Sequence, residues 1–137
     1  MKKLTQILAT AILMLSLNVS ASTFEDFGQK AGLVKLMDQF MADLVSNEKT
    51  RPHFEKADQK RIKEQLVEQF CEVLEGPCKY TGKSMAQSHS GLDISKNEFN
   101  ALVEVLRTTM SKQNIPVRAQ NKLLAKLAPM HRDIIRK

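Results

Sequence analysis

The sequence has only two cysteines, Cys71 and Cys78, seven residues apart. Neither belongs to a Cys-x-x-Cys pair, so a thioredoxin-type redox centre is excluded. In an oxidising compartment the two thiols could form a disulfide, and the alternative is two buried free thiols. The sequence leaves both alternatives open, because it does not give the distance between the two Cα atoms.

Dense runs of one charge are also absent. The formal net charge is +6, and Lys2 and Lys3 supply two of these charges. The remaining basic residues are spread along the chain, so nucleic-acid binding has little support. The histidines at 53, 89 and 131 do not stand three or four residues from one another, as zinc ligands on a helix do. A conventional zinc cluster is therefore unsupported.

The N-terminus has the features of a secretory signal. A short basic start precedes an apolar run that ends at Leu17, and Val19 and Ala21 fit a signal-peptidase site. The run is shorter than the roughly 20 residues that span a bilayer. We therefore expect residues 1–21 to be a cleaved signal peptide. Residues 22–137 should then form one exported, periplasmic domain without a membrane anchor.

The apolar residues of this domain recur with helical spacing, and no segment alternates as a half-buried strand does. The fold class predicted is therefore all-α. Asp58 is a suitable N-cap for one long helix, and Ser95 with Glu98 forms a capping box that opens another. We expect residues 47–56 to be an irregular connection, and Pro129 to kink the last helix.

The segment from Gly76 to His89 contains the most informative residues. Its Gly82-Lys83-Ser84 resembles the end of a phosphate-binding loop, but the glycine spacing is wrong and a helix precedes it. A short helical turn follows, with Met85 four residues before His89. A carbonyl near Met85 could accept the ring N–H and leave the other ring nitrogen free for iron. A surface or capping role is the alternative, and it is the interpretation we favour for His53 and His131.

Several motifs, in their order and spacing, resemble those of group I truncated haemoglobins. No single motif is specific, but together they cover nearly all of the chain from Thr23 to Ile135. They are Phe40 with Phe54, Arg61-Ile62-Lys63, Leu74-Glu75-Gly76-Pro77, Tyr80-Thr81-Gly82, Met85 through His89, Gly91, Ile94 with Phe99, and Leu127-Ala128-Pro129.

The resemblance implies a truncated globin-like 2-on-2 helical sandwich that encloses non-covalently bound haem b. In it, His89 matches the proximal iron ligand and Phe54 the aromatic residue that packs on the haem face. Arg61 matches a basic residue near a haem propionate, and Tyr80 falls near the haem rim. The other positions that match the haem-binding wall are Ile62, Met85, Ile94, Phe99 and Leu102.

The distal side of the implied pocket departs from the family pattern. Met41 stands where many members have a tyrosine, and Leu66 where they often have a glutamine. With Phe40 and Ile62, these residues make the implied pocket apolar, and Gln65 is the nearest polar residue, at its edge. A buried donor to bound oxygen contributes about 1 to 3 kcal/mol. We therefore expect fast oxygen release.

These features predict a haem protein that reversibly binds oxygen, carbon monoxide or nitric oxide at the His89-ligated iron. One alternative is a periplasmic electron-transfer protein with a redox partner, in which the Met41 sulfur is a second axial ligand. Others are a nitric-oxide-detoxifying enzyme of the dioxygenase type and a haem-free helical interaction module. We expect a ligand-binding protein more than an enzyme, since no distal acid–base groups are evident.

Overall fold

The computed structural model describes residues 20–136, and every regular element in that range is a helix. The predicted all-α class is thus confirmed. Within this range no helix has both the length and the apolar character that crossing a membrane requires. Except for Ser20 and Ala21, the predicted signal peptide lies outside the described residues. The elements are α1 Thr23–Asp26, α2 Gln29–Ser46, α3 Arg51–Phe54, α4 Gln59–Val73, α5 Met85–His89, α6 Lys96–Lys112, α7 Val117–Leu127, the 3₁₀ helix η1 Ala128–Met130 and α8 His131–Ile134.

The long helices begin where the sequence supplies capping groups. The Asp58 side chain accepts the backbone N–H of Arg61 at the start of α4, at 3.1 Å. At the start of α6, Ser95 and Glu98 form the predicted capping box. Such side chains satisfy backbone donors that have no partner inside the helix. These two predicted helix starts are therefore confirmed.

Residues 47–56 are more regular than predicted. They contain α3, whose Pro52 lies in the first helical turn, where a missing N–H has little cost. The buried Thr50 precedes this helix, and its hydroxyl donates to the carbonyl of Leu44 at 2.6 Å. The prediction of an irregular connection was wrong over Arg51–Phe54, because Pro52 is accommodated in the first turn of this helix.

Helix α4 ends shortly before Pro77, and the last helical segment of the chain is interrupted at Pro129. After α4, Glu75 adopts the left-handed backbone conformation, with φ of 63°, and Gly76 donates its N–H to the carbonyl of Cys71. The predicted kink at Pro129 is confirmed, because the 3₁₀ turn η1 contains this residue and separates α7 from α8.

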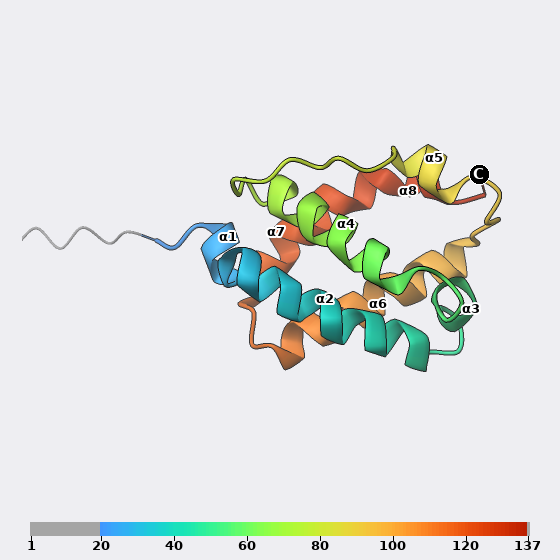
Figure 1. The fold of residues 1–137 in the computed structure, drawn as a ribbon. Helices are drawn as coiled ribbons and strands as arrows, with labels where there is room; N and C mark the ends of the chain where they lie inside the picture. Colours follow the sequence, from blue (N-terminus) through green and yellow to red (C-terminus); the bar gives the residue numbers. More distant parts are fainter. Residues whose placement is uncertain (1–19, 137) are drawn as a thin grey trace, which may run out of the picture.

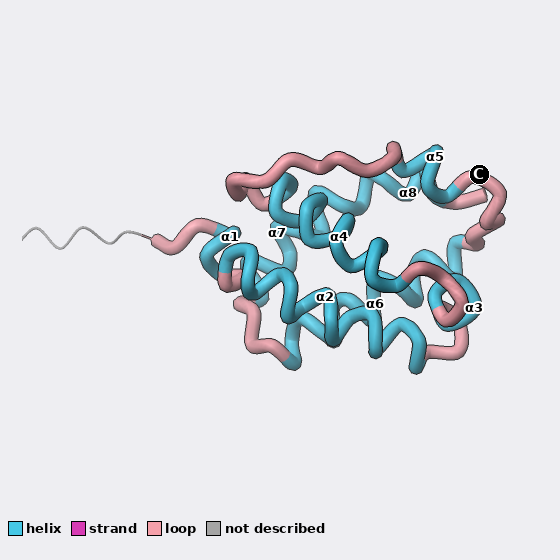
Figure 2. Tube along the Cα trace, in the orientation of Figure 1, coloured by secondary structure: helices cyan, strands magenta, loops and turns pink. Residues whose placement is uncertain are grey.

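Two pairs of helices form the sandwich. Figure 1 shows α2 and α4 together in front of α6 and α7. Helix α2 packs on both α4 and α6, α4 also packs on α7, and the short α5 lies against α8. A long loop follows α4 and runs back along it toward α5, as the pink segment in Figure 2 shows. This path brings the C-terminal half of α4 beside the residues that precede α5.

The core lies between these layers and is mainly aliphatic, with methionine and a few aromatic side chains. Burial of this apolar surface is the principal force that holds the helices together. The buried core residues are Phe27, Leu33, Leu36, Met37, Phe40, Leu44, Val67, Phe70, Cys71, Leu74, Val105, Leu106, Met110, Ile115, Ala119 and Leu123.

Candidate functional site

His89 is the last residue of α5, and its ring orientation is fixed by its own helix. Nδ1 lies 2.8 Å from the carbonyl oxygen of Met85 and 3.0 Å from the hydroxyl of Ser88. A carbonyl only accepts, so Nδ1 carries a proton, and in the neutral tautomer that this bond selects the lone pair is on Nε2. This is the arrangement that metal-binding histidines adopt, with one nitrogen hydrogen-bonded and the other available to the metal.

Helix α5 owes its position to a capping box and to the loop before it. The Ser84 side chain accepts the N–H of Gln87, and the Gln87 side chain accepts the N–H of Ser84. The two residues thereby fix the first turn of a helix only five residues long. A helix this short is not stable alone, so its surroundings must hold it in place.

The loop residues 80–82 are bound to the side of α4. Glu68 accepts the backbone N–H of Thr81 at 3.1 Å and its hydroxyl at 2.8 Å, and these two bonds lower the pKa of the Glu68 carboxyl. Tyr80 donates its hydroxyl to the carbonyl of Lys83 at 2.7 Å, and burial raises its pKa. A Cβ at Gly82 would meet the Gln65 oxygen and the Tyr80 hydroxyl, so a side chain there would require these two groups to shift.

These contacts locate two of the predicted site residues. Tyr80 packs within the loop, where its hydroxyl is already used. The Gln65 side chain lies against Gly82, and its amide nitrogen is 3.5 Å from a Glu68 oxygen. The polar group of Gln65 therefore lies at the boundary between α4 and the loop.

Cys71 and Cys78 form a disulfide with their Cα atoms 5.6 Å apart. Cys71 is fully buried in α4, and Cys78 is half-buried in the loop. The bridge attaches the beginning of the loop to α4, as the Glu68 contacts attach its middle. The loop after α4 is thus attached to this helix at two points, Cys78 and Thr81.

The predicted distal residues come from α2 and α4, which pack on each other. Phe40 and Met41 are 2% and 3% exposed, whereas Ile62 and Leu66 are only half-buried. All four side chains are apolar. The four side chains therefore supply no hydrogen-bond donor to a ligand.

A contact between α3 and α6 lies beside two predicted haem-wall aromatics. His53 Nε2 is 3.1 Å from a Glu98 oxygen, and each residue directly precedes a half-buried phenylalanine, Phe54 or Phe99. The backbone and side chain of Ser95 and the His53 ring lower the pKa of Glu98 to about 2. His53 thus links α3 to α6. The surface or capping role expected from the sequence did not include this link.

The remaining predicted haem-binding residues are apolar side chains that protein atoms cover only partly, together with one exposed cation. Half-buried apolar groups and a histidine whose Nδ1 is hydrogen-bonded fit a flat, largely apolar ring that carries its own iron. Arg61 is exposed at the start of α4, so its guanidinium is accessible to an acidic group. The half-buried apolar residues are Phe54, Ile62, Leu66, Met85, Ile94, Phe99 and Leu102.

The described chain offers no other metal site. Within residues 20–136, no three His, Cys, Asp or Glu residues are grouped so that they could bind an ion. A single available histidine suits a metal whose other ligands come from a cofactor rather than from the protein. This distinction favours haem iron over zinc or calcium.

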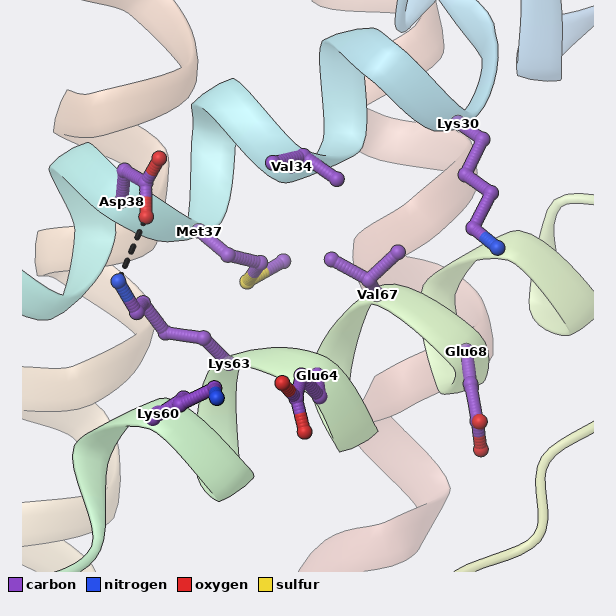
Figure 3. Close-up of a pocket in the computed structure, with 9 residues that line it drawn as sticks. All are labelled: Lys30, Val34, Met37, Asp38, Lys60, Lys63, Glu64, Val67 and Glu68. Atoms are coloured by element: carbon purple, nitrogen blue, oxygen red, sulfur yellow. Dashed lines mark hydrogen bonds and ion pairs between the residues drawn. The ribbon is translucent and has the colours of Figure 1, made fainter.

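A separate groove of about 390 Å³ lies between α2 and α4. Figure 3 shows its apolar floor, with Val34, Met37 and Val67 between the two helices, and an ion pair between Lys63 and Asp38 at one end. None of its lining residues is a predicted site residue. Its rim contains both lysines and carboxylates, with no group that stands out as a catalyst.

One important residue was missed in the sequence. Gln69 on α4 is 8% exposed, and its amide nitrogen lies 3.4 Å from the Met85 sulfur and 3.7 Å from the Met130 sulfur. The available signal was a polar residue next to Phe70 within the apolar stripe of α4. Its contacts join α4 to α5 and η1, and they therefore bear directly on His89.

Known proteins with related sequences and folds are truncated haemoglobins. A group 1 truncated hemoglobin of Mycolicibacterium paratuberculosis is 26% identical over 114 residues, which are 83% of this chain and 84% of that protein. The truncated hemoglobin of Tetrahymena pyriformis in its Fe(III) form has a TM-score of 0.80 at 20% identity, covering 85% of this chain and all of that one. The 2/2 hemoglobin of Synechococcus, solved with covalently attached heme, has a TM-score of 0.77 at 18% identity, with 84% of this chain and 98% of that one covered.

A family model also matches almost the whole of the described chain. The model of the family described as "Bacterial-like globin" matches residues 22–136. This range runs from the N-cap of α1 to the residues after α8, so it includes all the helices of the sandwich. The chain therefore belongs to the bacterial-like globin family and is a truncated globin.

Proposed function

We propose that this truncated globin binds haem b through His89 and reversibly binds a diatomic gas: oxygen, carbon monoxide or nitric oxide. The observation that carries the proposal is the 2.8 Å contact between His89 Nδ1 and the Met85 carbonyl, which leaves Nε2 free. When bound, haem would supply an iron with one further coordination position for the gas. Membership of the globin family supports the same conclusion.

The other residues of the site would enclose and orient the cofactor. The half-buried Phe54 and Leu102 would exclude water from its faces, and burial of such side chains contributes about 1.5 to 3 kcal/mol each. The exposed Arg61 would form a charge-assisted bond to a propionate. Because the distal residues Met41, Ile62 and Leu66 lack polar atoms that donate, the gas would be held by the iron with little help from the protein.

The apolar distal side gives little support to the two alternative haem functions, nitric-oxide dioxygenation and electron transfer. A nitric-oxide dioxygenase needs oxygen to stay bound until it reacts, and a pocket without a donor does not favour this. Electron transfer would need Met41 to act as a second axial ligand and a redox partner to dock. Met41 is 3% exposed in α2, and packing is the commoner role of a buried methionine. We therefore place gas binding first.

We further propose that the protein works in the periplasm after removal of residues 1–21. The signal-like N-terminus supports export, and the Cys71–Cys78 disulfide fits an oxidising compartment. Cell fractionation and N-terminal sequencing of the mature protein would test this. A mature chain that begins at Ser22 and is released from the periplasm is the expected result, and an intact Met1 in the cytosol would contradict it.

The absorption spectrum of the purified mature protein with added haemin tests the cofactor. We expect a Soret band that shifts when carbon monoxide is added to the reduced protein. The band should be lost or strongly changed in His89→Ala but retained in His131→Ala, the matched control. If the wild type binds no haemin, the haem-free interaction module becomes the better account.

A further inference from the structure

The position of Gln69 is unusual for a polar side chain. It is 8% exposed, yet the acceptors within reach of its amide nitrogen are the thioether sulfurs of Met85 and Met130, at 3.4 and 3.7 Å. Thioethers are weak acceptors, and burying an amide without strong partners has a cost in stability. A leucine at this position would avoid that cost. The burial of the amide therefore points to a role other than core stability.

The two sulfurs belong to the elements that surround the proximal histidine. Met85 is the first residue of α5, and its carbonyl oxygen accepts the Nδ1 proton of His89. Met130 ends η1 and directly precedes α8, the helix that lies against α5. One amide on α4 thus contacts both sides of the small α5–α8 unit.

Within the part of the chain that the structure describes, no other side-chain hydrogen bond joins α4 to α5, η1 or α8. The disulfide and the Glu68–Thr81 bonds hold the loop before α5, but they act upstream of Ser84. Within residues 20–136, the contact from Gln69 to Met85 is the only side-chain hydrogen bond that joins α5 to another helix. Apart from the loop that leads into it, the helix that presents His89 is held by its packing on α8.

We propose that Gln69 is a positioning residue for the proximal ligand. By holding Met85, its amide fixes the carbonyl that orients the His89 ring, and so sets the direction of Nε2. This inference rests on the proposed haem binding at His89. It also makes α4 responsible for both sides of the haem, since Ile62 and Leu66 of the same helix line the distal side.

Resonance Raman spectroscopy of the reduced holoprotein tests this directly, because the iron–histidine stretching band reports the strength and orientation of that bond. In Gln69→Leu we expect the band to shift or broaden, and haem transfer to an acceptor globin to become roughly two- to fivefold faster. Gln69→Met, with a similar length but no donor, should behave in the same way and serves if the leucine variant folds poorly.

Gln120→Leu is the matched control. Gln120 is also a buried amide, 4% exposed, but it donates to the Ile115 carbonyl at 2.8 Å and forms no hydrogen bond with α5. We expect this variant to lose stability while its iron–histidine band stays as in the wild type. Comparison of the two variants therefore distinguishes a positioning role for Gln69 from the general effect of removing a buried amide.

A double-mutant comparison with Met85→Leu assigns the effect to the amide–sulfur contact. Met85→Leu removes the sulfur and keeps the backbone carbonyl, so the double variant should show no larger band shift than either single one. A Soret band together with an unchanged iron–histidine band in Gln69→Leu and Gln69→Met would overturn this inference alone. Absence of a Soret band in the wild type would overturn the proposed function as well.

Discussion

Nδ1 of His89 lies 2.8 Å from the carbonyl oxygen of Met85, one helical turn earlier. This bond decides the tautomer, because the carbonyl can accept a proton but cannot supply one. It also restrains rotation of the ring about its bond to the helix. The chain thus directs Nε2 away from this bond, and a carbonyl partner of this kind makes a metal-bound histidine a stronger ligand.

The buried Met41 offers the clearest test of the distal side. In Met41→Tyr, the new phenol would give the pocket the hydrogen-bond donor that it lacks. We expect oxygen dissociation to slow by roughly ten- to a hundredfold, in line with about 1 to 3 kcal/mol for such a bond. Stopped-flow displacement of oxygen by carbon monoxide measures this rate. An unchanged rate would mean that another residue or a water molecule already donates.

Met41→Leu is the matched control for that variant. It removes the sulfur at nearly constant volume, so a purely packing methionine predicts unchanged spectra and oxygen kinetics. If the Met41 sulfur were an iron ligand, the reduced protein would instead change from six- to five-coordinate. That outcome would favour the electron-transfer function over gas binding.

The disulfide should contribute strongly to stability. It closes a short loop between Cys71 and Cys78, and a bridge of this size stabilises the folded state by roughly 2 to 3 kcal/mol. Denaturant unfolding of the wild type with and without a reductant measures this difference. The double variant Cys71→Ala with Cys78→Ala should be less stable and insensitive to the reductant. Equal stability of the oxidised and reduced wild type would contradict the prediction.

Glu98 should make stability depend on pH at the acidic end. Its pKa is lowered from 4.5 to about 2 in the folded state, so the folded protein binds this proton less readily than the unfolded chain does. Its stabilising effect is therefore complete above pH 4.5 and is lost as the pH falls toward 2. Glu98→Gln should reduce this part of the pH dependence and cost roughly 0.3 to 1 kcal/mol near neutral pH.

Thermal unfolding between pH 2 and 7 would measure the Glu98 effect. Glu104→Gln is the control, because Glu104 is an exposed carboxylate on the same helix. If the unfolding temperatures of Glu98→Gln and the wild type changed in parallel over this pH range, Glu98 would not be a source of the pH dependence.

Gly82 should not tolerate a larger residue. In Gly82→Ala the new Cβ would meet the Gln65 oxygen and the Tyr80 hydroxyl, and the latter is held by the Lys83 carbonyl. We expect a loss of roughly 1 to 3 kcal/mol in unfolding free energy. Adding Gln65→Ala should recover part of it by making room. No recovery in the double variant would show that the strain lies elsewhere.

Much of the architecture could be predicted because the signals are local. The carboxylate of Asp58 and the Ser95–Glu98 pair mark helix starts through contacts only three residues apart, and the break at Pro129 follows from the missing N–H. Helix α3 was missed because Pro52 is compatible with a first turn as well as with a loop. Local chemistry alone does not decide between the two.

The parts of the site that could not be predicted depend on contacts between distant residues. His53 meets Glu98 across 45 positions, and Gln69 meets Met130 across 61. Neither pair has a spacing that marks it in the sequence. For Cys71 and Cys78 the sequence left a disulfide and two free thiols as alternatives, and the path of the loop along α4 decides between them by bringing Cys78 to Cys71. The sequence could place His89 on a helical turn but could not identify what holds that turn.

The most direct test of this account is the ferric and ferrous absorption spectrum of the mature protein, recorded beside that of His89→Ala. We predict that the wild type binds haemin in a one-to-one complex, and that the reduced form binds carbon monoxide with a shifted Soret band. His89→Ala should lose this complex or give the spectrum of haem without a histidine ligand. Identical spectra for the two proteins, or no Soret band in either, would contradict the assignment of His89 as the iron ligand.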